Sequence, residues 1–174
     1  MTTLSQALAV WTAVFLMLAI ESPMLQHLHL AYFAPDLALI AVVWIAIRMS
    51  VEGGALLCFA LGYLKDGFVM AVPIGMHMEI FVLLFFVVRY FSSKLLVRGL
   101  LTLILTVAVT SLLASGLFAV LSLLFDPTFT DYRLVMRLAG PVALVTAPFA
   151  PVVFFLLDRV DGLFVRKQAT LFQR

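Results

Sequence analysis

Long apolar stretches separated by short polar ones constrain this chain more than any other feature. The stretch Leu100–Phe125, for example, contains no His, Lys or acidic residue. A transmembrane helix needs about 20 mostly apolar residues, so 174 residues accommodate five or six such helices with short loops. No part of the sequence shows the alternating pattern of a membrane β-barrel strand. We therefore expect an all-α fold, a polytopic membrane protein whose six transmembrane helices form one compact bundle.

Composition supports a membrane protein and argues against several functions. Apolar residues make up 65% of the chain and charged residues 11%, whereas soluble domains average about 45–50% and about 25%. The net charge of +2 is too small to indicate a nucleic-acid partner. The single cysteine, Cys58, lies in an apolar stretch, and we interpret it as a small packing residue. Metalloprotease, serine-hydrolase and phosphate-loop motifs are missing, so we expect no enzymatic activity, cofactor or metal.

The chain reads as a single integral membrane domain over residues 1–174. The predicted spans cover residues 4–21, 35–50, 52–66, 74–93, 100–125 and 137–157, with a basic cytoplasmic tail over 158–174. Glu21-Ser22-Pro23 is expected to end the first span. Three prolines in the last span predict a kink, because each removes a backbone hydrogen bond. The tail alternates charged and apolar residues and is expected to lie along the membrane surface.

The second and third spans have short uninterrupted apolar cores. A helix of about 12 residues rises roughly 18 Å, against a hydrocarbon thickness of about 30 Å. We therefore expect neighbouring helices to shield both spans. In the third span, Gly54, Cys58 and Gly62 are spaced four apart and form one ridge of small residues. Such a ridge favours close contact with another helix.

Basic residues indicate the orientation in the membrane. Cytoplasmic loops carry an excess of Lys and Arg. If the N-terminus is inside, the cytoplasmic side receives Arg48, Arg89, Lys94, Arg98, Arg159, Arg166, Lys167 and Arg174. The outer side receives Lys65, Arg133 and Arg137. This asymmetry predicts a multi-pass protein of the cytoplasmic membrane with both termini in the cytoplasm.

A polar corner between the third and fourth spans gathers the scarce polar groups of the chain. Asp66 follows the small-residue ridge, and Lys65 precedes it. A turn containing Gly75 leads back into an apolar stretch that carries His77 and Glu79. We expect Gly75 to be a backbone requirement of this turn. The corner is the first place to look for function, and by the orientation above it lies near the outer face.

Glu79 lies about one turn inside the fourth span. An unpaired charge at membrane depth costs at least about 2.5–3.5 kcal/mol, so such a residue is a functional candidate by default. Lys65 is the nearest plausible cation, with His77 and Asp66 as further partners. We favour a structural or hydrated role for Glu79 over a recognition role. An intramembrane hydrolase has little support, because Ser111 and Ser115 lack a nearby base and no aspartyl-protease motif surrounds Asp66 and Glu79.

The same residues resemble the rod-shape-determining MreD family of membrane proteins, over most of the chain from about Pro35 onwards. The motifs that carry the resemblance are Pro35-Asp36-Leu37, Gly54 through Gly62 to Asp66, Pro73-Ile74-Gly75-Met76-His77, and a proline-containing last span followed by basic residues. Two positions depart from the family pattern. Lys65 stands where an apolar residue is usual, and Glu79 adds a charge.

The resemblance implies a non-enzymatic scaffold of the bacterial cell-elongation machinery in the inner membrane. Its implied partners are an MreC-like single-span protein, the actin-like filament protein and the peptidoglycan synthases, together with the lipid bilayer. The alternative is the substrate-binding membrane subunit of an energy-coupling-factor vitamin transporter, which is similar in size and number of helices. A binding subunit should enclose a cavity of a few hundred Å3 with convergent polar groups. A scaffold should show a closed bundle with an exposed apolar face.

Overall fold

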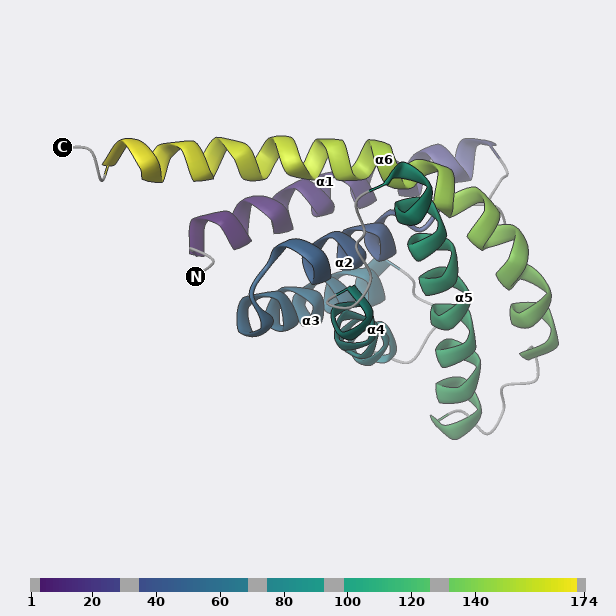
Figure 1. Cartoon of the computed structure of the whole chain (residues 1–174). Helices are drawn as coiled ribbons and strands as arrows, with labels where there is room; N and C mark the ends of the chain where they lie inside the picture. The colour runs from purple at the N-terminus through teal and green to yellow at the C-terminus, as the bar shows by residue number, and fades with distance from the viewer. Residues whose placement is uncertain (1–3, 29–34, 69–74, 93–98, 126–131, 172–174) are drawn as a thin grey trace.

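The computed structural model describes residues 4–28, 35–68, 75–92, 99–125 and 132–171, and these form six α-helices (Figure 1). The helices are α1 (Leu4–Leu28), α2 (Leu37–Arg48), α3 (Val51–Phe68), α4 (Met76–Ser92), α5 (Leu100–Phe125) and α6 (Tyr132–Leu171). The described residues contain no strand. The prediction of an all-α fold with six helices is therefore confirmed.

Helix α2 is the centre of the fold. It contacts each of the other five helices, and Figure 1 shows it between α1 and α6 on one side and α3 and α4 on the other. Nine consecutive residues, Ala38–Ala46, are at most 1% exposed. A helix that is apolar all round is stable only where it is buried all round. Helix α2, the predicted short second span, is thus shielded by its neighbours as expected. The expectation is wrong for α3, the other short span, where Leu56 and Tyr63 are 72% and 64% exposed.

Both ends of α2 are closed by side chains. At the amino end, the Asp36 carboxylate accepts a hydrogen bond from the Leu39 N–H at 3.0 Å, as an N-cap residue does. At the carboxyl end, the Arg89 guanidinium of α4 donates to the carbonyls of Ala46 at 3.0 Å and Met49 at 2.7 Å. A helix leaves its terminal backbone groups without intrahelical partners. Polar side chains at both ends therefore allow α2 to be buried.

Helices α3 and α4 pack along the small-residue ridge. A Cβ on Gly62 would lie 2.6 Å from the Met78 nitrogen and 2.7 Å from the His77 carbonyl oxygen of α4. A Cβ on Gly54 would lie 2.6 Å from the Phe85 ring. Cys58, between these glycines, is fully buried. Small residues let two helix backbones approach this closely, and the ridge lies in the contact that its spacing predicts.

The remaining helices enclose this core. Helices α5 and α6 pack as a long antiparallel pair, and α6 bends so that its second half runs beside α1 (Figure 1). The helix carries Pro141, Pro148 and Pro151, which explain the bend because each lacks an N–H for the helix ladder. At the far end of the α1–α6 contact, the Gln6 amide donates to Asp161.

Two helices extend beyond the predicted spans. Helix α1 continues through Pro23 to Leu28, because the following Met-Leu-Gln segment favours helix and resumes the pattern. Helix α6 begins at Tyr132 and not at residue 137. It also continues to Leu171 through the charged segment that was assigned to a surface tail. That segment contains no proline, so nothing in it stops the helix.

Among the described residues, two helices are long and apolar enough to cross a membrane by length and composition alone. They cover Leu100–Phe125 and Tyr132–Leu163. Shorter apolar helices cover Gln6–Ala19 and Leu37–Arg48. Two helices of this kind are by themselves weak support for membrane association, since a buried core helix of a soluble protein meets the same criterion.

Candidate functional site

The polar corner is built around Asp66, near the carboxyl end of α3. Its carboxylate accepts hydrogen bonds from the Gly75 N–H at 2.8 Å and the His77 N–H at 3.1 Å. These two groups belong to the amino end of α4, where backbone N–H groups lack helical partners. Gly75 has a φ of +106°, which L-residues rarely adopt. Asp66 therefore caps α4 from another helix, and Gly75 makes the turn that this capping requires.

The His77 side chain also binds Asp66. Its Nδ1 lies 2.6 Å from Asp66 Oδ1, and both side chains are buried. Because a carboxylate can only accept, this contact places a proton on Nδ1. The ring packs against two aromatic side chains, with ring-centre distances of 6.2 Å to Phe81 and 5.9 Å to Phe118. The imidazole is thereby fixed in orientation by α3, α4 and α5.

A second charged pair joins α2 to α3. The Lys65 ammonium donates to the Asp36 carboxylate, whose other oxygen caps α2. The Lys65 nitrogen also lies 5.3 Å from the centre of the Phe81 ring, within range of a cation–π interaction. The Asp36 N–H donates to the Thr146 hydroxyl of α6 at 3.0 Å. Asp36 thus connects three helices at the amino end of α2.

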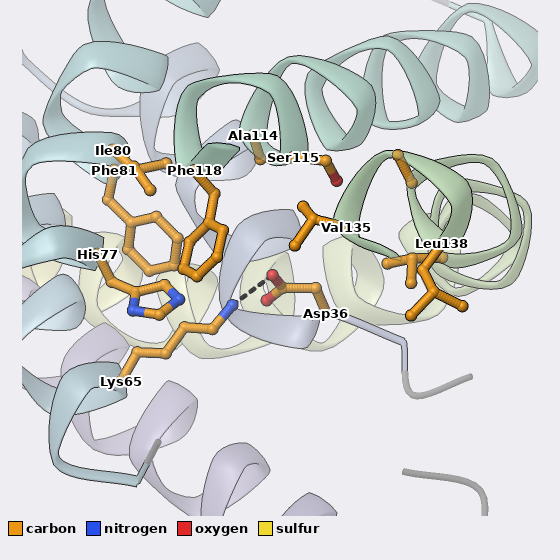
Figure 2. A pocket seen from close by; sticks show the side chains of 12 residues that line it. Asp36, Lys65, His77, Ile80, Phe81, Ala114, Ser115, Phe118, Val135 and Leu138 are labelled. Atoms are coloured by element: carbon orange, nitrogen blue, oxygen red, sulfur yellow. Dashed lines mark hydrogen bonds and ion pairs between the residues drawn. The ribbon is translucent and has the colours of Figure 1, made fainter. Parts of the chain in front are cut away.

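These side chains border a cavity of about 240 Å3. Figure 2 shows Lys65 and His77 pointing toward Asp36, with Phe118 and Ser115 of α5 across from them. The cavity is lined by Asp36, Lys65, His77, Ile80, Phe81, Ala114, Ser115, Phe118, Val135, Leu138, Ala139 and Val142. Its polar groups come from α2, α3 and α4, whereas α5 and α6 contribute mainly apolar walls. The cavity therefore has one polar end and one apolar side.

A different polar group lies at the opposite end of α2. Asp158 of α6 accepts from the Trp44 indole at 2.9 Å and from Arg48 at 3.1 Å. The side chains of Arg48 and Asp158 are 54% and 43% exposed, so this ion pair is solvated and worth little by itself. The buried Trp44 contact is the part that fixes α6 against α2.

The structure brings together most of the residues predicted from the sequence, with one correction, which concerns the partner of Lys65. Asp36, Asp66, Gly75 and His77 all lie at the junction of α2, α3 and α4. Glu79 is exposed, and its carboxylate makes no hydrogen bond or ion pair within the described ranges, because it faces away from the cavity side of α4. Lys65 does not pair with Glu79, since Asp36 offers it a carboxylate at a shielded helix end.

Sequence reasoning did not find the Lys65–Asp36 pair, the Thr146 contact or the wall formed by Phe118. Asp36 and Lys65 are 29 positions apart, and Asp36 and Thr146 are 110 apart. A signal existed for the first pair only. Lys65 and Asp36 were scarce opposite charges predicted to lie on the same side of the membrane.

The geometry supports binding more than chemistry. The Ser115 hydroxyl donates to the Ser111 carbonyl of its own helix at 3.1 Å and is not aligned with a base. Within the described part of the chain, no three His, Cys, Asp or Glu side chains form a metal-binding group. Comparisons with protein-family models, with curated proteins and with solved structures found no match to this chain.

Proposed function

We propose that this chain is an integral membrane protein with six spans that acts as a non-enzymatic scaffold through helix association. The first support is the distribution of apolar side chains. Each of the helices around α2 exposes large apolar residues, whereas α2 exposes none among the described residues. On α5 the exposed set includes Leu101 at 82% and Leu124 at 70%. Soluble monomers rarely expose large apolar patches, but lipid tails or partner helices cover such surfaces.

The elongation-scaffold role rests on the positions of the residues that resemble the MreD family. The proline-aspartate pair opens α2, Gly62 sets the α3–α4 contact, and Asp66 caps α4. Each of these residues holds the α2–α3–α4 junction together and none is arranged for a reaction. The structural positions of these motif residues are the main support for the scaffold role, because a scaffold needs a stable helical framework that binds partners.

The proposed setting is the bacterial inner membrane, with both termini in the cytoplasm. The partners are an MreC-like single-span protein and, through it, the actin-like filament protein and the peptidoglycan synthases. The test is to express the tagged chain in a rod-shaped bacterium that lacks its own counterpart. Extraction in mild detergent should recover the single-span partner, and rod shape should be restored. Recovery of no elongation protein together with round cells would contradict the scaffold role.

The cavity favours a second candidate, the small-molecule-binding subunit of a membrane transporter. Its convergent Asp36, Lys65 and His77 side chains are of the kind expected in a binding subunit, but its volume of about 240 Å3 lies below the range of about 300–1,000 Å3 for small-molecule sites. The exposed apolar faces meet the criterion for a scaffold at the same time. The charged groups of the cavity are paired with each other, which leaves less polar capacity for a vitamin. We therefore rank the scaffold first.

A further inference from the structure

The cavity is bordered by a buried polar atom for which the described residues supply no hydrogen-bond partner. His77 is 9% exposed, and its Nδ1 is bound to Asp66. Its other ring nitrogen, Nε2, makes no hydrogen bond within the described residues, although the ring borders the cavity (Figure 2). Buried polar atoms almost always have a partner. In a neutral ring whose proton lies on Nδ1, Nε2 carries a lone pair and requires a donor.

Lys65, at the same end of the cavity, has N–H groups that require hydrogen-bond acceptors. Its ammonium group has three N–H bonds, and one of them binds Asp36. The Phe81 ring lies against the ammonium but offers no hydrogen-bond acceptor atom. The Lys65 side chain points toward the same polar end as the His77 ring (Figure 2). A group placed between them must donate to one nitrogen and accept from the other, and a hydroxyl does both.

Each charged group at this end already has a hydrogen-bonding partner. Lys65 is paired with Asp36, and the Asp66 carboxylate receives three hydrogen bonds at the amino end of α4. A charged ligand would bring an uncompensated charge into a largely apolar cavity, which is costly. The opposite walls are apolar side chains of α5 and α6, including Phe118 and Leu138. The occupant should therefore be uncharged, with one polar end and an apolar body.

We propose that this cavity binds an uncharged alcohol, with its hydroxyl between Lys65 and His77 and its apolar body between α5 and α6. Since a water molecule occupies about 30 Å3, a cavity of about 240 Å3 holds about eight non-hydrogen atoms. That size excludes a whole lipid. This proposal goes beyond the scaffold role, because the chain would bind the alcohol by itself, without any partner protein.

The test uses the full chain in bilayer discs of phosphatidylcholine, whose headgroup carries no hydroxyl. A diazirine derivative of octan-1-ol is photolysed in the discs, and the adducts are mapped by mass spectrometry. Unlabelled octan-1-ol, octane, octanoate and octylamine then compete at equal concentration in the bilayer. We expect adducts on the cavity walls near Phe118 and Leu138. Octan-1-ol should compete about tenfold better than octane, which is the effect of one net hydrogen bond.

A pair of variants separates the cavity from the lipid-facing surface. Ala114→Leu fills the cavity from α5, whereas Ala108→Leu makes the same change on α5 outside it. The first variant should lose the wall adducts and the second should keep them. Equal competition by octane, better competition by octanoate or octylamine, or wall adducts that persist in Ala114→Leu would each overturn the proposal. The assay contains no partner protein, so its failure leaves the scaffold role to be judged separately.

Discussion

Gly62 of α3 lies directly against the backbone of Met78 in α4. A Cβ at position 62 would come within 2.6 Å of the Met78 nitrogen and closer still to its Cα. Real Cβ atoms essentially never come this near another heavy atom, so only glycine fits without moving a helix. The contact lies one turn from Asp66, whose carboxylate caps α4. Backbone approach and capping therefore fix the same junction.

Gly62→Ala should destabilise the protein by about 1–3 kcal/mol, because an added methyl group must push two backbones apart. Gly67→Ala is the matched control on the same helix, since a Cβ there meets nothing within 4 Å. It should change stability by no more than about 0.5 kcal/mol. Thermal unfolding in detergent measures both. Equal stability of the two variants would show that the helices do not meet at Gly62.

Asp66→Ala should cost about 2 kcal/mol, because it removes a cap and leaves the half-buried Gly75 N–H and the buried His77 N–H without this acceptor. His77→Ala should cost less, and Glu79→Ala should be neutral because Glu79 is exposed. Partner recovery and rod-shape restoration should fall in the same order as stability. If all three variants assembled fully and yet failed to restore rod shape, the scaffold role would be wrong.

Arg89→Met should destabilise the bundle by about 2 kcal/mol. Methionine keeps an apolar stem but cannot donate to the Ala46 and Met49 carbonyls at the end of α2. Arg48→Met is the control at the same end, because the Arg48 side chain is exposed and its ion pair with Asp158 is solvated. Unfolding by stepwise addition of denaturing detergent should give a lower midpoint for Arg89→Met than for Arg48→Met. Similar midpoints would remove Arg89 from the capping role.

The Lys65–Asp36 pair should show strong coupling in a double-mutant cycle. Lys65→Met alone leaves a shielded carboxylate without its cation, which should cost about 3 kcal/mol. Adding Asp36→Asn removes that charge while keeping an oxygen that can cap α2. The double variant should therefore be more stable than Lys65→Met alone. Additive losses in unfolding experiments would mean that the two groups act independently.

The proposed topology can be tested with reporter fusions. The distribution of Lys and Arg predicts that a reporter after Arg174 lies in the cytoplasm. A reporter inserted between Phe125 and Tyr132, which join α5 and α6, should lie on the outer side. Alkaline phosphatase and a fluorescent protein report the two sides in complementary fashion. Reporters on the same side would contradict six spans.

Much of the framework was predictable because it depends on local patterns. Apolar stretches located the helices, the four-residue spacing of Gly54, Cys58 and Gly62 predicted a close contact of α3 with another helix, and Gly75 predicted the turn. The helix ends were less predictable. Pro23 did not stop α1 and charged residues did not stop α6, because good helix formers follow in both places.

The site was predictable only in part, because its contacts join residues that are far apart in sequence. Asp66 and His77 lie 11 positions apart across one turn, and their proximity followed from that turn. Asp36 meets Thr146 of α6 across 110 positions, and no local pattern contains that information. Glu79 is exposed, in keeping with the hydrated role favoured from the sequence, while Lys65, its suggested partner, pairs with the distant Asp36.

The central position of α2 has a consequence for how the protein is made. The ribosome releases α2 second, yet four of the five helices that surround it are released later. Helices α1, α3, α4 and α5 can pack against α2 before then, but until α6 emerges the contacts of Thr146 and Asp158 at the two ends of α2 are missing. Its burial is therefore completed late, after the chain is nearly finished. Truncation before α6 should leave a product that quality-control proteases recognise, however well the earlier helices have formed.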